Sequence, residues 1–232
     1  MWQKKGNSIK RIFRKKRMSF PEKKENQIYY FLESIGLYTE NEVFIISEKL
    51  AGEVLHGIYT GERGMYTPIY DTAIVIAEKN VTEKKIEEVY LHELLHSIAG
   101  KLQYESDMLV RSGYLTIENG YTYGHYLEEG YAQFFTQMYF FRQYGEKVRN
   151  NDISTIAASG LQLLCIQYPE LEKMIRSLRS QNTRSLQSLI AKIRENIPET
   201  GNICLKDTPY TRNDFKRTTK KIKECIQKNT QK

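Results

Sequence analysis

Apolar side chains recur along most of the chain with the spacing of helices, and in two short segments with the pattern of strands. Helical spacing predicts helices over residues 25–36, 82–101, 126–144, 152–167, 170–180, 183–195 and 211–227. Apolar and β-branched runs predict strands at 43–46 and 72–77. The pattern therefore predicts an α+β fold in which a small mixed sheet is followed by a helical C-terminal lobe.

Two segments carry turn signals. Residues 51–70 contain four glycines and one proline, which indicates a loop or an irregular hairpin. Asn119-Gly120 separates two alternating runs within residues 114–123. Asn-Gly suits a type I′ turn, which needs positive φ at both central residues, so this segment predicts a β-hairpin.

Length and composition set the organisation of the chain. Its 232 residues are 40% hydrophobic, which is enough for a substantial core. We expect a basic, flexible arm over 1–24, a core over 25–145, and a helical subdomain over 146–232 that completes the same domain. The chain contains no apolar run long enough to span a membrane and no apolar stretch typical of a secretory signal. The three widely spaced cysteines indicate reduced thiols, so we expect a cytoplasmic protein.

The net charge of +7 is unevenly distributed. Residues 1–24 hold ten Lys/Arg and one acid, and residues 211–232 hold eight and two, which leaves 17 bases and 25 acids between them. The basic ends therefore flank a mildly acidic body, and the arm 1–24 is a candidate contact for an anionic membrane or nucleic acid. The arm lacks the interleaved aromatic residues of single-strand binders, which weakens the nucleic-acid interpretation.

The segment His92-Glu93-Leu94-Leu95-His96 carries the main chemical signal. Two histidines at i and i+4 lie on one helix face, so both imidazoles can reach one metal ion. The glutamate after the first histidine lies beside that face, where it can reach a metal-bound water without being a ligand. The spacing therefore predicts a zinc site with His92 and His96 as ligands and Glu93 as general base.

A catalytic zinc site needs a third protein ligand. A histidine six residues after His96, as in metzincins, is excluded because position 102 is Leu. A glutamate on the next helix is the other common solution, and both Glu128 and Glu129 are available there. His125, in the adjoining segment, is a further candidate ligand.

The two motifs together, His-Glu-x-x-His at 92–96 and Leu-x-Glu-Gly-x-Ala at 127–132, resemble the gluzincin group of zinc peptidases, whose best-known members are thermolysin-like. The resemblance spans about residues 89–133. It implies that Glu129, which precedes the glycine, is the third ligand of one catalytic Zn²⁺ ion. It also implies a zincin-like fold, with the sheet packed against an active-site helix and a ligand-bearing helix, and with strand 72–77 at the sheet edge beside an extended substrate.

The chain departs from that group in two respects. Glu129 follows His96 by 33 positions, a longer interval than in thermolysin-like enzymes. Gln133 stands where those enzymes have an aspartate that bonds the first histidine, so it can accept a hydrogen bond but supplies no charge. His125 is the favoured candidate for a catalytic donor to the substrate carbonyl, a role that the motifs leave unassigned.

These residues predict a zinc-dependent peptidase that acts on a peptide or protein substrate. The alternative is a latent or inactive relative that binds or regulates, placed on a membrane or nucleic acid by its arm. Docking of the basic segment 211–227 on the acidic body is one way in which latency would arise. The sequence specifies neither the peptide specificity nor the oligomeric state.

Overall fold

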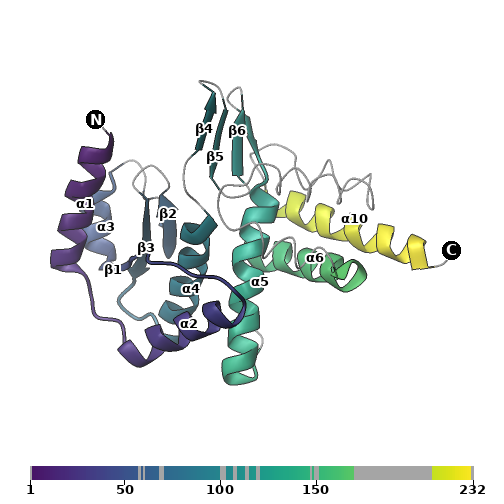
Figure 1. The fold of residues 1–232 in the computed structure, drawn as a ribbon, viewed down its shortest axis with the longest axis horizontal. Helices are drawn as coiled ribbons and strands as arrows, with labels where there is room; N and C mark the ends of the chain where they lie inside the picture. Colours follow the sequence, from purple (N-terminus) through teal and green to yellow (C-terminus); the bar gives the residue numbers. More distant parts are fainter. Residues whose placement is uncertain are drawn as a thin grey trace. The chain divides into compact units, whose positions relative to one another are not determined.

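The computed structural model describes residues 2–56, 59, 61–67, 71–99, 103–106, 109–112, 115–118, 121–146, 148, 152–169 and 211–230. These residues form helices and two small sheets, which confirms the predicted α+β class. The chain divides into two compact units, residues 1–101 and 102–232. Figure 1 shows their elements, and each unit is described separately.

The first unit is built on a three-stranded mixed sheet in the order β1-β3-β2. Strand β1 (Val43–Ser47) runs parallel to β3 (Thr72–Ala77), and β2 (Gly64–Thr67) runs antiparallel to β3. The expectation that 72–77 forms the sheet edge is wrong. All six residues of β3 are buried, and a strand that is apolar on both faces suits the centre of a sheet. Strand β2 lies at the edge instead.

Helices cover both faces of this sheet (Figure 1). Helices α1 (Trp2–Lys16) and α3 (Glu48–Val54) lie on one face, and α4 (Glu83–Ala99) packs on the other. The even-numbered residues of β1 and β3 form an apolar cluster with the first two helices, whose fully buried members include Phe13, Phe44 and Ile74. Their alternation follows the two-residue period of a strand.

The prediction of a loop or an irregular hairpin over 51–70 is wrong in part, because the segment contains the end of α3. Strand β2, in the same segment, pairs antiparallel with β3, as a hairpin would. Helix α3 forms where Ser47 ends β1, and the Ser47 hydroxyl accepts a hydrogen bond from the Leu50 amide at 3.3 Å. This cap satisfies one of the amides that a helix start leaves unpaired. Leu50 and Ala51 then bury the helix against the sheet.

The basic N-terminal segment differs from the solvated, flexible arm expected from its charge. Residues 2–16 form helix α1, and the Phe13 side chain is fully buried against β1 and β3. The Met18 amide then donates a hydrogen bond to the Ile45 carbonyl at 2.7 Å, which fixes the exit from the helix. Burial of such a ring stabilises the docked helix by a few kcal/mol, while the basic residues beside Phe13 stay exposed to solvent.

Helix α4 is held at both ends. Near its start, buried Glu87 accepts a hydrogen bond from Lys24 of α2 (Glu22–Ser34), and the Tyr90 hydroxyl donates to Glu25 at 2.6 Å. Burial raises the pKa of Tyr90, so its hydroxyl keeps the proton that it donates. Near the C-terminal end, Asn41 donates to the Ser97 carbonyl at 2.9 Å.

The second unit begins with a four-stranded antiparallel sheet in the order β4-β5-β6-β7. Its strands are β4 (Gln103–Ser106), β5 (Leu109–Ser112), β6 (Leu115–Glu118) and β7 (Tyr121–Tyr123). Pairing of Glu118 with Tyr121 confirms the predicted hairpin, while the Asn119-Gly120 turn lies outside the described residues. Strands β4 and β5 were not predicted, because their polar residues mask the alternation.

Helices complete this unit. They are α5 (His125–Tyr144), α6 (Ile153–Gln167) and α10 (Arg212–Thr230), which match the predictions for these segments to within three residues. The helices predicted over 170–180 and 183–195 lie outside the described residues. No helix in the described part of the chain is long and apolar enough to cross a membrane.

Replacement of Phe13 by alanine tests the docked state of α1. We expect Phe13→Ala to lower the free energy of unfolding by about 3–5 kcal/mol, because a buried aromatic ring is lost. Ile12→Ala, at an exposed neighbouring position, is the control and should change stability little. Chemical denaturation monitored by circular dichroism measures both, and equal stability of Phe13→Ala and wild type would show that α1 is not docked in solution.

Candidate metal centre

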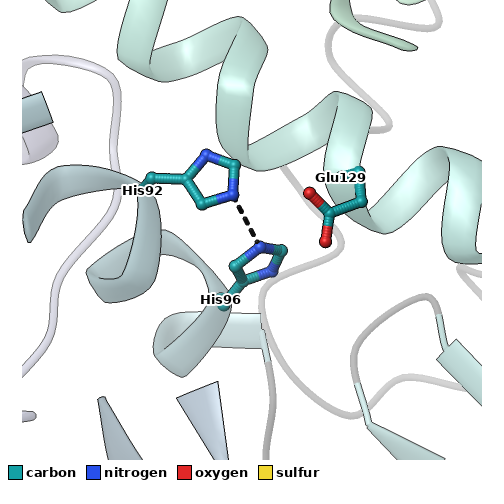
Figure 2. A group of neighbouring side chains, drawn as sticks. All are labelled: His92, His96 and Glu129. Carbon is teal, nitrogen blue, oxygen red and sulfur yellow. Dashed lines mark hydrogen bonds between the residues drawn. The ribbon is translucent and has the colours of Figure 1, made fainter. Parts of the chain in front are cut away.

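The two histidines of the motif lie on one face of α4, one turn apart. Their Nε2 atoms are 3.0 Å apart and the ring centroids 4.7 Å (Figure 2). Two nitrogens bound to one tetrahedral zinc ion at about 2.05 Å would be about 3.3 Å apart. The spacing therefore suits a shared ion with little movement of either ring. His96 is buried and His92 is half-buried.

Glu129 lies on α5, and its carboxylate is held from within the second unit. The Ser154 hydroxyl, in the first turn of α6, donates a hydrogen bond to Glu129 Oε2 at 2.7 Å. His125 Nε2, one turn before Glu129 on α5, is 3.5 Å from Oε1. These contacts restrict the rotamers of Glu129, which lowers the entropy that its carboxylate would lose on binding a metal.

Gly130 explains how Ser154 reaches Glu129. A Cβ atom added at Gly130 would lie 2.6 Å from Leu161 Cδ1 and 3.2 Å from the Ala157 carbonyl carbon of α6. A side chain at this position would have to push the Leu161 side chain aside and would crowd the α6 backbone, so glycine permits the close packing of α6 on α5. The Glu-Gly pair of the motif thus has a physical reason in this chain: the glycine lets α6 approach, and α6 fixes the glutamate beside it.

His92, His96 and Glu129 form a group of side chains that could hold a metal ion. Each offers one ligand atom, and the three atoms lie within 4.8 Å of one another. Figure 2 shows the two imidazoles and the carboxylate directed toward one another. Among the described residues no other such group of three His, Cys, Asp or Glu is found. Two imidazoles and a carboxylate are the donor set of many catalytic zinc sites.

Glu93 follows His92 on α4 and is buried, with 6% of its surface exposed. Its side chain lies against Gly64 of the edge strand β2, where an added Cβ atom would be 2.7 Å from Glu93 Oε1. The glycine therefore leaves the space that the Glu93 carboxylate occupies. Any larger residue at position 64 would displace this side chain.

Three other predicted site residues, His125, Glu128 and Gln133, lie on α5 with Glu129. His125 lies beside Glu129, and its ring contacts Phe215 of α10 edge to face, at a centroid distance of 5.8 Å. It is outside the three-residue metal group, and its role as a donor stays a prediction. Gln133 is buried one turn after Glu129, and its hydrogen bond to His92 also stays a prediction. Glu128, the rival ligand, is buried but is not part of the group.

Ser154 and Gly64 were missed by the sequence analysis. Asp152 gives a visible cap signal, and its carboxylate accepts from the Thr155 amide at 2.8 Å, so the start of α6 was predictable. Nothing in the spacing connects position 154 with position 129, because the contact depends on how α6 packs on α5. Gly64 stood among other glycines in a segment interpreted as a loop.

No protein-family model, curated protein or solved structure matches the chain. The interpretation of the site therefore depends on its own residues and geometry.

Metal content of purified variants tests the ligand set. We expect about one zinc ion per wild-type chain, and a loss of that ion in His92→Ala, His96→Ala and Glu129→Ala, because each removes one of three protein ligands. Glu128→Gln and His56→Ala, at an adjacent carboxylate and an exposed histidine, are the matched controls and should keep the ion. Full zinc content in Glu129→Ala, with loss in Glu128→Gln or in His125→Ala, would refute the assignment.

The hydrogen bond from Ser154 should tune metal affinity. Ser154→Ala leaves Glu129 in place but removes one of the two described contacts that hold its carboxylate, so we expect zinc affinity to fall roughly 10–100-fold. Ser154→Thr keeps the hydroxyl and should restore most of the affinity. Ser159→Ala is the control, since the Ser159 hydroxyl bonds only the Ile156 carbonyl of its own helix in the described contacts. Chelator competition measures affinity, and unfolding of the metal-free proteins shows whether the fold alone has changed.

Proposed function

We propose that the chain is a zinc-dependent peptidase whose catalytic ion is held by His92, His96 and Glu129. The observation that carries the proposal is the convergence of these three ligand atoms within 4.8 Å, with Glu93 directly after the first histidine. A structural zinc site has four protein ligands and no bound water, so a glutamate that is not a ligand would have no function beside it. Three ligands leave a coordination position open, as catalysis requires.

Zinc is the metal that the donor set favours. Imidazole nitrogens suit zinc and other late first-row metals, whereas calcium and magnesium prefer sites made of oxygen atoms. Zinc in such a site lowers the pKa of a bound water to about 7 and polarises a carbonyl oxygen.

Glu93 is the proposed general base. Its carboxylate would accept a proton from the attacking water and transfer it to the nitrogen of the departing amine. Burial suits this role, because a buried carboxylate loses water that would compete for the same hydrogen bonds. Gly64 supports it as well, by leaving room for this side chain.

An extended peptide is the proposed substrate. Strand β2 is an outer strand of the described sheet, and a peptide added beside it would continue that sheet. Gly64 of that strand lies against Glu93, so a peptide added at this edge would run beside the proposed base. This replaces the expectation that β3 is the substrate strand, since β3 is central.

Substitution of Glu93 tests the activity separately from metal binding. We expect Glu93→Gln to lower the hydrolysis of a quenched-fluorescent peptide library by roughly 10²–10⁴-fold, because the amide cannot accept the proton. Zinc content should stay at the wild-type value, since Glu93 is not a ligand.

Glu83→Gln is the matched control. Glu83 is a glutamate of the same helix, but it lies exposed in the first turn of α4, ten residues before Glu93. It should keep wild-type turnover. Wild-type hydrolysis by zinc-loaded Glu93→Gln would eliminate the mechanism, and a zinc-loaded wild type that cleaves no peptide would favour the binding or regulatory alternative.

A further inference from the structure

The strongest charge feature outside the metal centre is the outer face of α1. Residues 1–20 contain eight Lys or Arg and no acidic residue. The buried position of Phe13 fixes which face of the helix points away from the sheet. The described positions on that outer stripe are Ser8, Arg11, Ile12, Lys15 and Lys16, which follow the i, i+3, i+4, i+7, i+8 spacing of one helix face.

All five positions of this stripe are exposed. Some bases elsewhere on the segment have acidic partners: Arg14 bonds Glu42 at 2.9 Å through Nε, and Lys10 lies 3.9 Å from Asp71. Among the described residues, no carboxylate pairs with the three bases of the stripe. Their charges therefore face solvent and are available to an anionic partner.

An exposed apolar residue lies in the middle of these bases. Ile12 is 38% exposed, and Met18, just after the helix, is 48% exposed. A helix that presents bases around exposed aliphatic side chains suits the interface of an anionic bilayer, where the bases contact headgroups and the aliphatic groups reach the acyl boundary. Proteins that bind single-stranded nucleic acid instead combine basic residues with exposed aromatic rings, and the described positions of the stripe include no aromatic residue.

We propose that the outer stripe of α1 binds an anionic phospholipid surface while Phe13 stays buried in the first unit. The helix would lie along the headgroups and would not insert deeply, because Phe13, its largest apolar side chain among those that the structure describes, is buried against the sheet. This inference is independent of the metal centre and of peptidase activity.

Vesicle binding of the full chain tests the proposal. Wild type should sediment with phosphatidylserine–phosphatidylcholine vesicles, not with pure phosphatidylcholine, and added salt should weaken binding. The triple variant Arg11→Gln, Lys15→Gln, Lys16→Gln should lower the partition coefficient on the order of 100-fold, at about fivefold per base near the surface. Ile12→Ser should lower it several-fold and leave the salt dependence unchanged.

The matched control removes three exposed bases from the other basic helix, α10, as Lys216→Gln, Lys220→Gln, Lys223→Gln. It changes net charge equally and should keep most of the vesicle binding. Equal losses in both triple variants, or no preference for anionic vesicles, would overturn the proposal. The same variants are titrated against duplex DNA and a single-stranded oligonucleotide. Binding there that depends on α1, without vesicle binding, would assign the stripe to nucleic acid instead.

Discussion

A fixed helix turn between His92 and His96 is the constraint on which the proposed chemistry depends. Their Nε2 atoms are 3.0 Å apart only because α4 is regular and both rings keep one rotamer. The helix is held near its start by Lys24 and Glu25 and near its end by Asn41. Burial of Leu91, Leu94 and Leu95 between these points removes the remaining freedom.

A glycine lies beside each of the two carboxylates of the proposed site, the general base Glu93 and the metal ligand Glu129. Gly64 leaves room for Glu93 beside the edge strand, and Gly130 lets α6 approach α5 closely enough for Ser154 to bond Glu129. In each case a missing Cβ atom determines where a carboxylate lies. The glycines contribute no chemical group, but they set the geometry in which the chemical groups act.

The basic helices at the two ends of the chain are both anchored by aromatic residues. Phe13 fixes α1 on the first sheet, and Phe215 packs against His125 and Tyr126 within the second unit. The hydroxyl of Tyr126 also lies 2.8 Å from that of Thr219 on α10. Both helices are therefore integral parts of their units, which means that removal of α10 would expose the surroundings of His125. A helix packed in this way within its unit differs from the free basic tail that latency by docking requires.

Local pattern alone determined the helices around residues 83–99, 125–144 and 153–167, the two strands of the first sheet at 43–47 and 72–77, and the histidine pair. These features depend on periodicity, capping and i, i+4 spacing, which a sequence displays directly. Tertiary structure decided the rest. It placed β3 at the sheet centre and β2 at the edge, because strand order depends on which faces find apolar partners. It buried Phe13 against the sheet, so that the segment expected to be a flexible arm is a docked helix whose basic residues stay exposed. It also brought Ser154 to Glu129, a contact that required the packing of two helices at a glycine and that no spacing along the chain records.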